Sequence, residues 1–520
     1  MQTNNHDFLE KQDVSFFYTG EGAYFLLSVF QLIIMAYFFG TSIQLDYFLI
    51  AFLIPNFFII SFEGIVKGGY IPKFIELKTD YDEYTSWRFF WQNILVTFLI
   101  SLAVLFVFVL FGRLIFGILA MGIKIKDTGT IIKIFSYLMM GVVFANVNTV
   151  IKETYFSFSE YRYPVIGKLI HMTFLIICVV AYSDELGIFS LVFGFTVGYI
   201  FEFFFLIMPL KDKFTHAKEA YLFYKSNAIK TMFKKTLPFL LTAAFLYIEI
   251  IVDRFIAGFG RNVGTISALN YAFSLSFKIG TIFIIPTIWI FYPKLVQAAR
   301  KKSRDEMKKI IIKTVNIIFF IGVPVFLLIL FASNEFVRVL FFRGTFSELS
   351  FRLTRNALIG YSFNIPLFGI NSFLIMAFYA QKELKSLTKI LATAIFINFW
   401  LDIILFGIFG VFGIAFATSI VQFILMIKLF KELKTKFGIR IILSDIQDFV
   451  KIIVISIVTL VLSIILLVAT NKIIGESLND YTLRLGFLIL EFGAIYYFLS
   501  KIFGVKAPDY LAIDERPGIG

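Results

Sequence analysis

The sequence predicts an all-α, polytopic membrane protein with about fourteen transmembrane helices. Hydrophobic residues make up 59% of the chain and charged residues only 16%, with a mean hydropathy of +0.86. A water-soluble domain is far less apolar than this. Apolar runs of about 20 residues, the length that crosses a bilayer as a helix, recur along the whole chain between charged or turn residues. No soluble domain fits between two of these runs.

The expected spans follow from these runs. The first begins after a polar start, contains Glu21 and Gln31, and lacks a small-residue cleavage site, so we expect it to be retained as a helix. The spans in order are residues 16–39, 46–66, 90–120, 131–150, 165–182, 187–209, 237–259, 266–291, 310–332, 353–379, 387–407, 411–430, 449–470 and 481–503.

The positive charge of the chain is distributed as in a membrane protein. The formal net charge is +13, and about thirty Lys and Arg fall in one set of alternate loops against about a dozen in the other. This bias is typical of cytoplasmic loops, so we expect both termini in the cytoplasm. The basic stretches at 211–235, 294–313 and 428–440 are then explained by topology and lipid headgroups, and we expect no nucleic-acid partner.

The chain shows no machinery for covalent chemistry. Cys178 is the only cysteine and the three histidines are scattered, which excludes an internal disulfide and a cysteine metal site. No glycine-rich phosphate loop lies on a soluble domain. We therefore expect a transporter driven by a gradient, not an enzyme, without a cofactor other than a coupling ion.

A weak internal repeat predicts two lobes. An acidic or amide residue followed by Tyr occurs early in the second and eighth spans: Asp46 and Tyr47, and Asn270 and Tyr271. An aromatic-X-Pro-Lys motif closes both spans, at residues 70–73 (YIPK) and 291–294 (FYPK). The repeat predicts an N-terminal lobe at 1–210 with helices one to six and a C-terminal lobe at 211–435 with helices seven to twelve. Two further helices at 436–503 and a polar tail at 504–520 complete the chain.

Three stretches of the sequence resemble one family. They are Phe39 to Asp46 with AFLIPN at 51–56, Glu63, Gly64 and Pro72; DRFIA at 253–257 with NYA at 270–272 and Pro293; and LFFRGTF at 340–346 with residues 357–358, 361–362, 378–380 and 388–390. They extend over most of the first twelve helices. On these residues the chain resembles the MurJ (MviN) lipid II flippases of the multidrug/oligosaccharidyl-lipid/polysaccharide exporter superfamily.

The resemblance implies a fold and a function. The fold would be two lobes around a central cavity, with the two extra helices shaping a groove for a lipid tail. The function would be alternating-access export of a polyprenyl-diphosphate-linked glycan, lipid II or a similar precursor, across the bacterial cytoplasmic membrane for peptidoglycan synthesis. The implied partners are this substrate and membrane lipids, and we expect a monomer.

Ionisable residues inside apolar spans are costly and mark candidate ion sites. Asp253 follows Glu249 by one turn in the seventh span, while Asn398 and Asp402 share a face of the eleventh span at an i,i+4 spacing. Their oxygens, with the hydroxyl of Thr418, are ligands that a hard cation prefers. The resemblance implies that Asp253, Asn398, Asp402 and Thr418 bind sodium.

Two alternative roles for these residues remain open. Asp253 could pair with Arg254 or Lys278 while Asn398 only bridges helices, or Glu249 or Asp253 could carry a proton. The transport mechanism requires that Asp253, Asn398 and Asp402 converge on one cavity.

The substrate site departs from the family. A buried diphosphate demands positive charge, yet the aligned positions of the family's cavity arginines read Phe25, Gln31, Ile60 and Ser274, and a neighbouring acidic position reads Phe277. Lys67, Lys168 and Lys278 are substitute cations, with Lys278 the first choice; the alternative for each is an ion pair or a snorkelling helix end. The predicted substrate site is Lys278, Gln31, Lys67, Glu63 and Ser274, and the predicted gating or proton residues are Glu249 and Glu21.

Three other function classes compete with a lipid-linked glycan flippase. A cation-coupled multidrug exporter of the same superfamily is favoured by the missing arginines, and the fourteen helices argue against it. A membrane glycan polymerase would need a sizeable outer loop, whereas the largest such segment, residues 333–355, is short and rich in Arg. An inactive scaffold that retains the fold is the third alternative.

Overall fold

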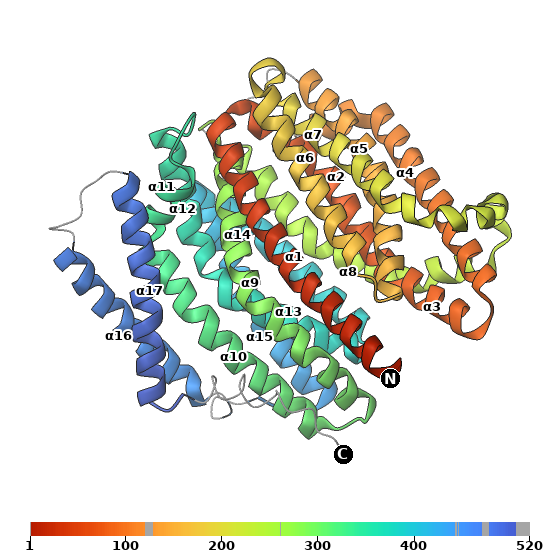
Figure 1. Cartoon of the computed structure of the whole chain (residues 1–520). Coiled ribbons are helices and arrows are strands. Elements are labelled where there is room, and N and C mark those ends of the chain that lie inside the picture. The colour runs from red at the N-terminus through yellow and green to blue at the C-terminus, as the bar shows by residue number, and fades with distance from the viewer. Residues whose placement is uncertain are drawn as a thin grey trace. The chain divides into compact units, whose positions relative to one another are not determined.

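The computed structural model describes residues 2–119, 128–260, 262–441, 445, 447–470 and 478–505. Every regular element in these ranges is a helix (Figure 1). The polar tail predicted at 504–520 lies outside the described residues from residue 506 onward.

The chain forms seventeen α-helices, one π-helix and one 3-10 helix in the described ranges. They are α1 (Gln2–Phe39), α2 (Ile43–Ile65), η1 (Val66–Tyr70), α3 (Ile71–Asp80), α4 (Glu83–Leu119), α5 (Thr128–Ser157), α6 (Arg162–Leu186), α7 (Phe189–Ile207), η2 (Met208–Lys225), α8 (Asn227–Ala257), α9 (Thr265–Arg300), α10 (Arg304–Phe331), α11 (Ser333–Phe341), α12 (Glu348–Ser362), α13 (Asn364–Ala380), α14 (Leu384–Phe409), α15 (Val411–Phe437), α16 (Gln447–Thr470) and α17 (Leu478–Ile502).

Each of the fourteen expected spans falls on helix. Eleven described helices are long and apolar enough to cross a membrane, and thirteen spans result if each of two bent helix pairs is one span. Helix α8, 31 residues long, occupies the place of the remaining expected span. The predicted fold class, an all-α polytopic membrane protein, is confirmed.

The tenth expected span consists of two helices instead of one. Helices α12 and α13 meet at an angle of 46° at Phe363. Pro366 is the third residue of α13 and has no N–H to donate to the carbonyl of Ser362, so the hydrogen-bond ladder cannot run through this point. The break is therefore encoded by a single proline.

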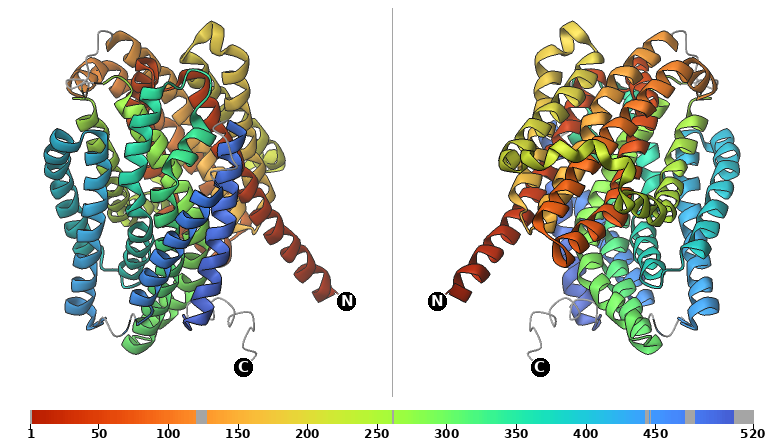
Figure 2. Two further views of the ribbon diagram at one scale, coloured as in Figure 1. Left: turned by 90° about the vertical axis from the view of Figure 1, so that its left-hand side faces the viewer. Right: turned by 90° about the vertical axis from the view of Figure 1, so that its right-hand side faces the viewer.

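Contacts divide the chain into two compact units, residues 1–267 and 268–520. In unit 1, α5 packs against α2, α4 and α7, and α6 and α7 form a close hairpin (yellow in Figures 1 and 2). Helix α8, which the sequence repeat places in the second lobe, packs against α2 and α4 of unit 1. The lobe boundaries from the repeat describe a duplication rather than contacts, and they stay a prediction.

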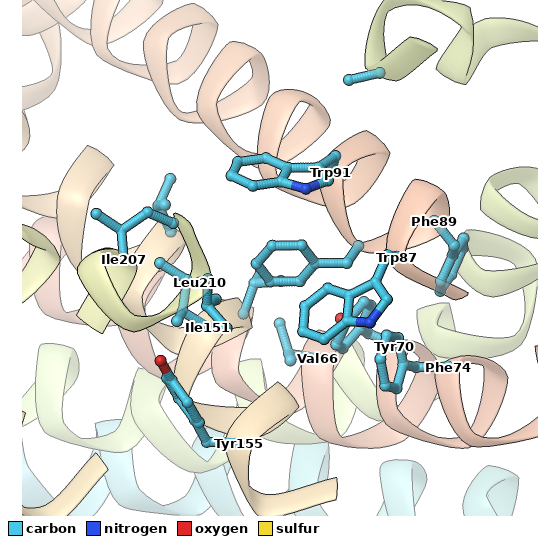
Figure 3. Close-up of a cluster of buried hydrophobic side chains, with 14 of the residues drawn as sticks. Val66, Tyr70, Phe74, Trp87, Phe89, Trp91, Ile151, Tyr155, Ile207 and Leu210 are labelled. Atoms are coloured by element: carbon cyan, nitrogen blue, oxygen red, sulfur yellow. The ribbon is translucent and has the colours of Figure 1, made fainter. Parts of the chain in front are cut away.

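A buried aromatic cluster holds one end of unit 1 together (Figure 3). Tyr70 stacks on Phe89 with ring centroids 5.6 Å apart, and its hydroxyl lies 2.7 Å from Thr154 Oγ1. The indole N–H of Trp91 donates to the carbonyl of Lys213 in η2 at 2.8 Å. The cluster thus ties η1, α3, α4, α5 and η2 into one body, which fixes the helix ends that carry the charged residues described below.

In unit 2, α14 and α15 form a close hairpin and α12 and α13 pack against α15. The terminal helices α16 and α17 (blue in Figures 1 and 2) pack against each other and against α10. The hydroxyl of Tyr496 on α17 donates to the carbonyl of Phe320 on α10 at 2.9 Å. Many other side chains of α16 and α17 are exposed and apolar, as expected of helices that face lipid.

Candidate functional site

Unit 1 contains a charged cavity of about 180 Å³. Helices α1, α2, α5, α6 and α7 and the π-helix η1 line it. The lining residues are Tyr24, Ile59, Glu63, Lys67, Ala145, Thr149, Lys152, Glu153, Phe156, Lys168, His171, Tyr199 and Glu202. Three of them are lysines and three are glutamates, in helices that are otherwise strongly apolar.

Lys67 lies on the π-helix and has two carboxylate partners. Its Nζ lies 2.5 Å from Glu63 Oε1 and 3.7 Å from Glu153 Oε1. Gly68 and Gly69 follow Lys67 within the five-residue π-turn, where the helix is locally widened. Such turns are rare and are frequent at functional sites. This local geometry lets one lysine contact carboxylates on both α2 and α5.

Lys152 and Glu202 form the more deeply buried pair of the cavity. Lys152 Nζ lies 2.9 Å from Glu202 Oε1, and Asn148 Nδ2 donates to Glu202 Oε2 at 3.1 Å. The Glu202 side chain is only 1% exposed and that of Lys152 16%. Both oxygens of this buried carboxylate therefore have a donor, as a charge inside a membrane requires.

Small residues bring α6 and α7 together at the cavity wall. A Cβ on Gly198 would lie 2.8 Å from the carbonyl oxygen of His171, and one on Gly194 would lie 2.9 Å from the Cα of Leu175. The close approach stacks the rings of His171 and Tyr199 with centroids 3.9 Å apart. Glycine at these positions is thus what allows the aromatic wall to form.

The charges of the cavity are nearly balanced. Lys168 Nζ lies 2.6 Å from Glu21 Oε1, so that each of the three lysines has a carboxylate partner. Glu21 completes a set of four acids for three lysines. An anion that binds the lysines competes with these carboxylates, so the site is suited to an exchange of partners rather than to permanent anion binding.

The structure brings together part of the predicted substrate site. Lys67 and Glu63 line the cavity, and Glu21 holds Lys168 beside it. Gln31 donates to Met35 Sδ within α1 at 3.5 Å and does not line this cavity. Ser274 and Lys278 lie half-buried on α9 in unit 2, so their relation to the unit 1 cavity stays a prediction.

The predicted site did not include six residues that line this cavity, namely Tyr24, Lys152, Glu153, His171, Tyr199 and Glu202. A signal was present, because Asn148 and Lys152 are four residues apart on an apolar helix and so share a face. What the sequence does not contain is the pairing of that face with Glu202, fifty residues later in the chain.

The predicted ion ligands of unit 2 are all buried, and two of them are in contact. Asn398 Nδ2 donates to Asp402 Oδ2 at 2.7 Å, and both residues are 0% exposed. Thr418, 4% exposed, lies on α15, which packs against α14. A carboxylate, an amide and a hydroxyl oxygen suit a sodium ion. Among the described residues, no group of three or more His, Cys, Asp or Glu is placed so that it could hold a metal ion.

Asp253 and Glu249 lie on α8 in unit 1, with Asp253 3% exposed and Glu249 half-buried. Convergence of Asp253 with Asn398 and Asp402 stays a prediction, because the structure describes the two units separately.

Comparison with known proteins identifies the family of this chain. The family model described as lipid II flippase MurJ matches residues 35–483. The chain belongs to the MurJ family. It is therefore a transporter rather than an enzyme, a multi-span protein of the bacterial inner membrane, and the predicted family is confirmed.

Relatives and solved structures agree with this membership. A probable lipid II flippase MurJ of Aquifex aeolicus (strain VF5) is 28% identical over 78% of this chain and 80% of its own length. A probable lipid II flippase MurJ of Buchnera aphidicola subsp. Schizaphis graminum (strain Sg) is 25% identical over 93% of this chain and 95% of its own length. A solved MurJ structure in an inward closed conformation has a TM-score of 0.77 at 21% identity and covers 94% of this chain and 98% of its own.

The fold is also shared more widely. An inward-facing multidrug transporter of the MATE family, in the MOP superfamily, has a TM-score of 0.69 at 13% identity, and covers 79% of this chain and 94% of its own. At this identity the likeness concerns the fold alone, so it does not transfer a substrate.

Proposed function

We propose that this chain moves a polyprenyl-diphosphate-linked glycan, lipid II or a close relative, across the cytoplasmic membrane by alternating access. The observation that carries the proposal is membership in the MurJ family over residues 35–483, together with a cavity of three lysines inside apolar helices. A lipid with an anionic diphosphate and a polar glycan needs both a charged cavity and a lipid-facing fold.

In this proposal Lys67, Lys152 and Lys168 exchange carboxylate partners for substrate phosphates. Lys67 already contacts two carboxylates and has a side chain that is 54% exposed, so an incoming phosphate meets it first. Lysine binds phosphate as a point charge, which tolerates a shifted phosphate better than the fork of an arginine does. This accounts for a flippase that lacks the arginines at Phe25, Gln31 and Ile60.

A cation would supply the coupling. Asp402, Asn398 and Thr418, with Asp253 from α8, would hold a sodium ion and neutralise the buried carboxylate of Asp402. Bound sodium shifts transport only if it favours one access state over the other. The side-chain oxygens of Asn398 and Asp402 lie on α14, which packs closely against α15.

The decisive experiment for the substrate is genetic rescue of cells depleted of their lipid II flippase. We expect the unmutated gene to restore growth and Lys67→Ala to lower lipid II translocation at least about tenfold, since one charge-assisted contact is worth about 1.5–3 kcal/mol. Lys73→Ala is the matched control, because Lys73 pairs with Glu76 on the short helix α3 outside the cavity. It should rescue fully.

Failure of the unmutated gene to rescue would remove lipid II as the substrate. The multidrug alternative gains support if expression of the gene instead protects cells against aromatic cations. That alternative has a basis in the aromatic walls Tyr24, Phe156 and Tyr199 and in the fold likeness to a MATE transporter.

Thermal stability in sodium tests the ion site. We expect sodium, compared with choline, to raise the unfolding temperature of the purified chain, and Asp402→Asn to abolish the rise. Asp448→Asn, at a buried carboxylate on α16, should keep it. An equal response to sodium in Asp402→Asn would exclude this residue as a ligand, and no response in the unmutated chain would favour protons.

We also propose that the chain is a monomer without a nucleic-acid partner and that both termini lie in the cytoplasm. Lys501 is exposed near the end of α17. A cysteine introduced there, in a chain without Cys178, should react with an impermeant maleimide only from the cytoplasmic side.

A further inference from the structure

An arginine cluster lies at one end of unit 2, apart from the residues used above. Helix α10 begins at the lysine-rich turn near Lys308, and α11 follows its other end (Figure 1). The arginines of α11, α12 and α17 therefore lie at the end of the unit opposite the lysine-rich one. By the charge rule for loops this is the outer face, where Arg is normally depleted.

The charges of three arginines of this cluster act on one carboxylate. Arg484, Arg355 and Arg338 all lie close enough to Glu335 for their charges to act on it. Glu335 is half-buried, and burial raises its pKa while the three guanidinium groups oppose that rise. Three guanidinium groups therefore act on one carboxylate at this site.

Aromatic rings hold the guanidinium groups in place. Arg338 Cζ lies 5.3 Å and Arg484 Cζ lies 5.5 Å from the ring centre of Tyr481, so that one ring contacts both groups. Arg338 also lies 4.5 Å from the ring of Phe351 and 5.0 Å from that of Phe342. Arginines packed in this way lose little side-chain freedom when they bind an anion.

Arg355 retains donor capacity. Its Nε is buried and has no hydrogen-bond partner among the described residues. An unfilled donor inside a protein is costly, and a planar guanidinium suits two phosphate oxygens at once. The matched contrast is Arg352 on the same helix, whose side chain is 73% exposed and lies 3.8 Å from Glu348.

The surroundings of the cluster indicate an amphiphilic ligand. Helix α17, which carries Tyr481 and Arg484, packs against α11 and α16. Beyond these contacts α16 and α17 present exposed apolar side chains, among them Ile457, Val461, Ile465, Leu483 and Leu490. A ligand bound at the arginines by its head would lie with its tail along this apolar surface.

We propose that Arg338, Arg355 and Arg484 form an outer-face binding site for the diphosphate of a polyprenyl lipid, which holds the substrate after it leaves the cavity. The proposal rests on the proposed function for the identity of the lipid. A diphosphate linked at both ends carries one negative charge on each phosphorus, so separate guanidinium groups of the cluster can bind each phosphate. Phosphatidylglycerol has a single phosphate and so engages fewer of the three guanidinium groups, which favours the diphosphate.

Binding of farnesyl diphosphate to the full chain in phosphatidylcholine nanodiscs tests the site. We expect Arg355→Gln/Arg484→Gln to weaken binding at least about tenfold, because two charge-assisted contacts are lost. Arg352→Gln should bind within about twofold of the unmutated chain, and farnesol should not bind at this site. Arg355→Lys, which keeps the charge without the fork, should fall between them.

The controls separate the possible outcomes. Each variant is first shown to elute as a single species with an unchanged melting temperature, and Arg355→Lys serves if the double variant does not fold. Unchanged binding by the double variant, or an equal loss in Arg352→Gln, would overturn the proposal. Loss of farnesyl diphosphate binding when the chain is placed in nanodiscs that contain phosphatidylglycerol would also overturn it, because the site would then bind phospholipid.

The same experiment stands apart from the test of lipid II transport, since it measures binding by purified protein. If the unmutated gene fails to rescue flippase-depleted cells while the arginine-dependent binding persists, the outer site stands and only the lipid II assignment falls.

Discussion

The buried pair of Lys152 and Glu202 allows a quantitative test of the charged cavity. Glu202→Gln removes a carboxylate that is 1% exposed and leaves the ammonium of Lys152, 16% exposed, without its charge partner at 2.9 Å. Breaking a buried pair from one side costs about 3–5 kcal/mol, since the remaining charge stays desolvated. We therefore expect Glu202→Gln to lower the free energy of unfolding by about 3 kcal/mol.

The assay is denaturant unfolding in mixed micelles, with a double-mutant cycle. Lys152→Met should cost a similar amount, and Lys152→Met/Glu202→Leu should recover most of the loss, because an apolar pair in place of a buried ion pair is often neutral or stabilising. The exposed pair Lys213 and Glu83, 33% and 68% exposed, is the control, and Glu83→Gln should cost under about 1 kcal/mol. A loss in Glu202→Gln no larger than in Glu83→Gln would refute the reasoning.

The remaining predictions concern unit 2. Gly413→Ala would place a Cβ 2.0 Å from the Leu405 carbonyl oxygen, so we expect it to lower the free energy of unfolding by about 1–3 kcal/mol or more, whereas Gly407→Ala, with open space around it, should be nearly neutral. Because burial raises the pKa of Glu335, folding favours its protonated form. The free energy of unfolding should therefore fall as the pH rises from 4.5, the ordinary pKa of a glutamate, toward the higher pKa of Glu335 in the folded chain. Glu335→Gln should show a smaller fall in the same titration. A pH response identical in Glu335→Gln would assign it to other groups.

The sequence was sufficient for the helices because of the cost of exposing backbone to lipid. Inside a bilayer every N–H and C=O must be satisfied within its own helix, so a long apolar run has one available structure. The spans at 16–39 and 411–430, for example, fall within α1 and α15. The bend at Phe363 was missed because Pro366 was read only as an apolar position within a continuous run.

Less of the site could be predicted from the sequence. A charged residue inside an apolar span marks a candidate site, but the sequence does not show which residue it pairs with. Glu63 and Lys67 are four residues apart, so their pairing follows from helix geometry. Lys152 with Glu202 and Lys168 with Glu21 join different helices, and these pairings depend on which faces pack together. Lys278, the first choice for phosphate, stays a prediction for the same reason.

Paired charges also suit a carrier better than a cavity of free lysines would. Three unpaired lysines inside apolar helices would carry a large desolvation cost and would hold a diphosphate too firmly to release it. Carboxylates at 2.5 to 2.9 Å lower that cost and, in the proposed mechanism, would compete with the substrate for each lysine. Under this proposal, binding and release would differ only by an exchange of partners, and a small difference between the two access states would be enough to move the substrate from one side to the other.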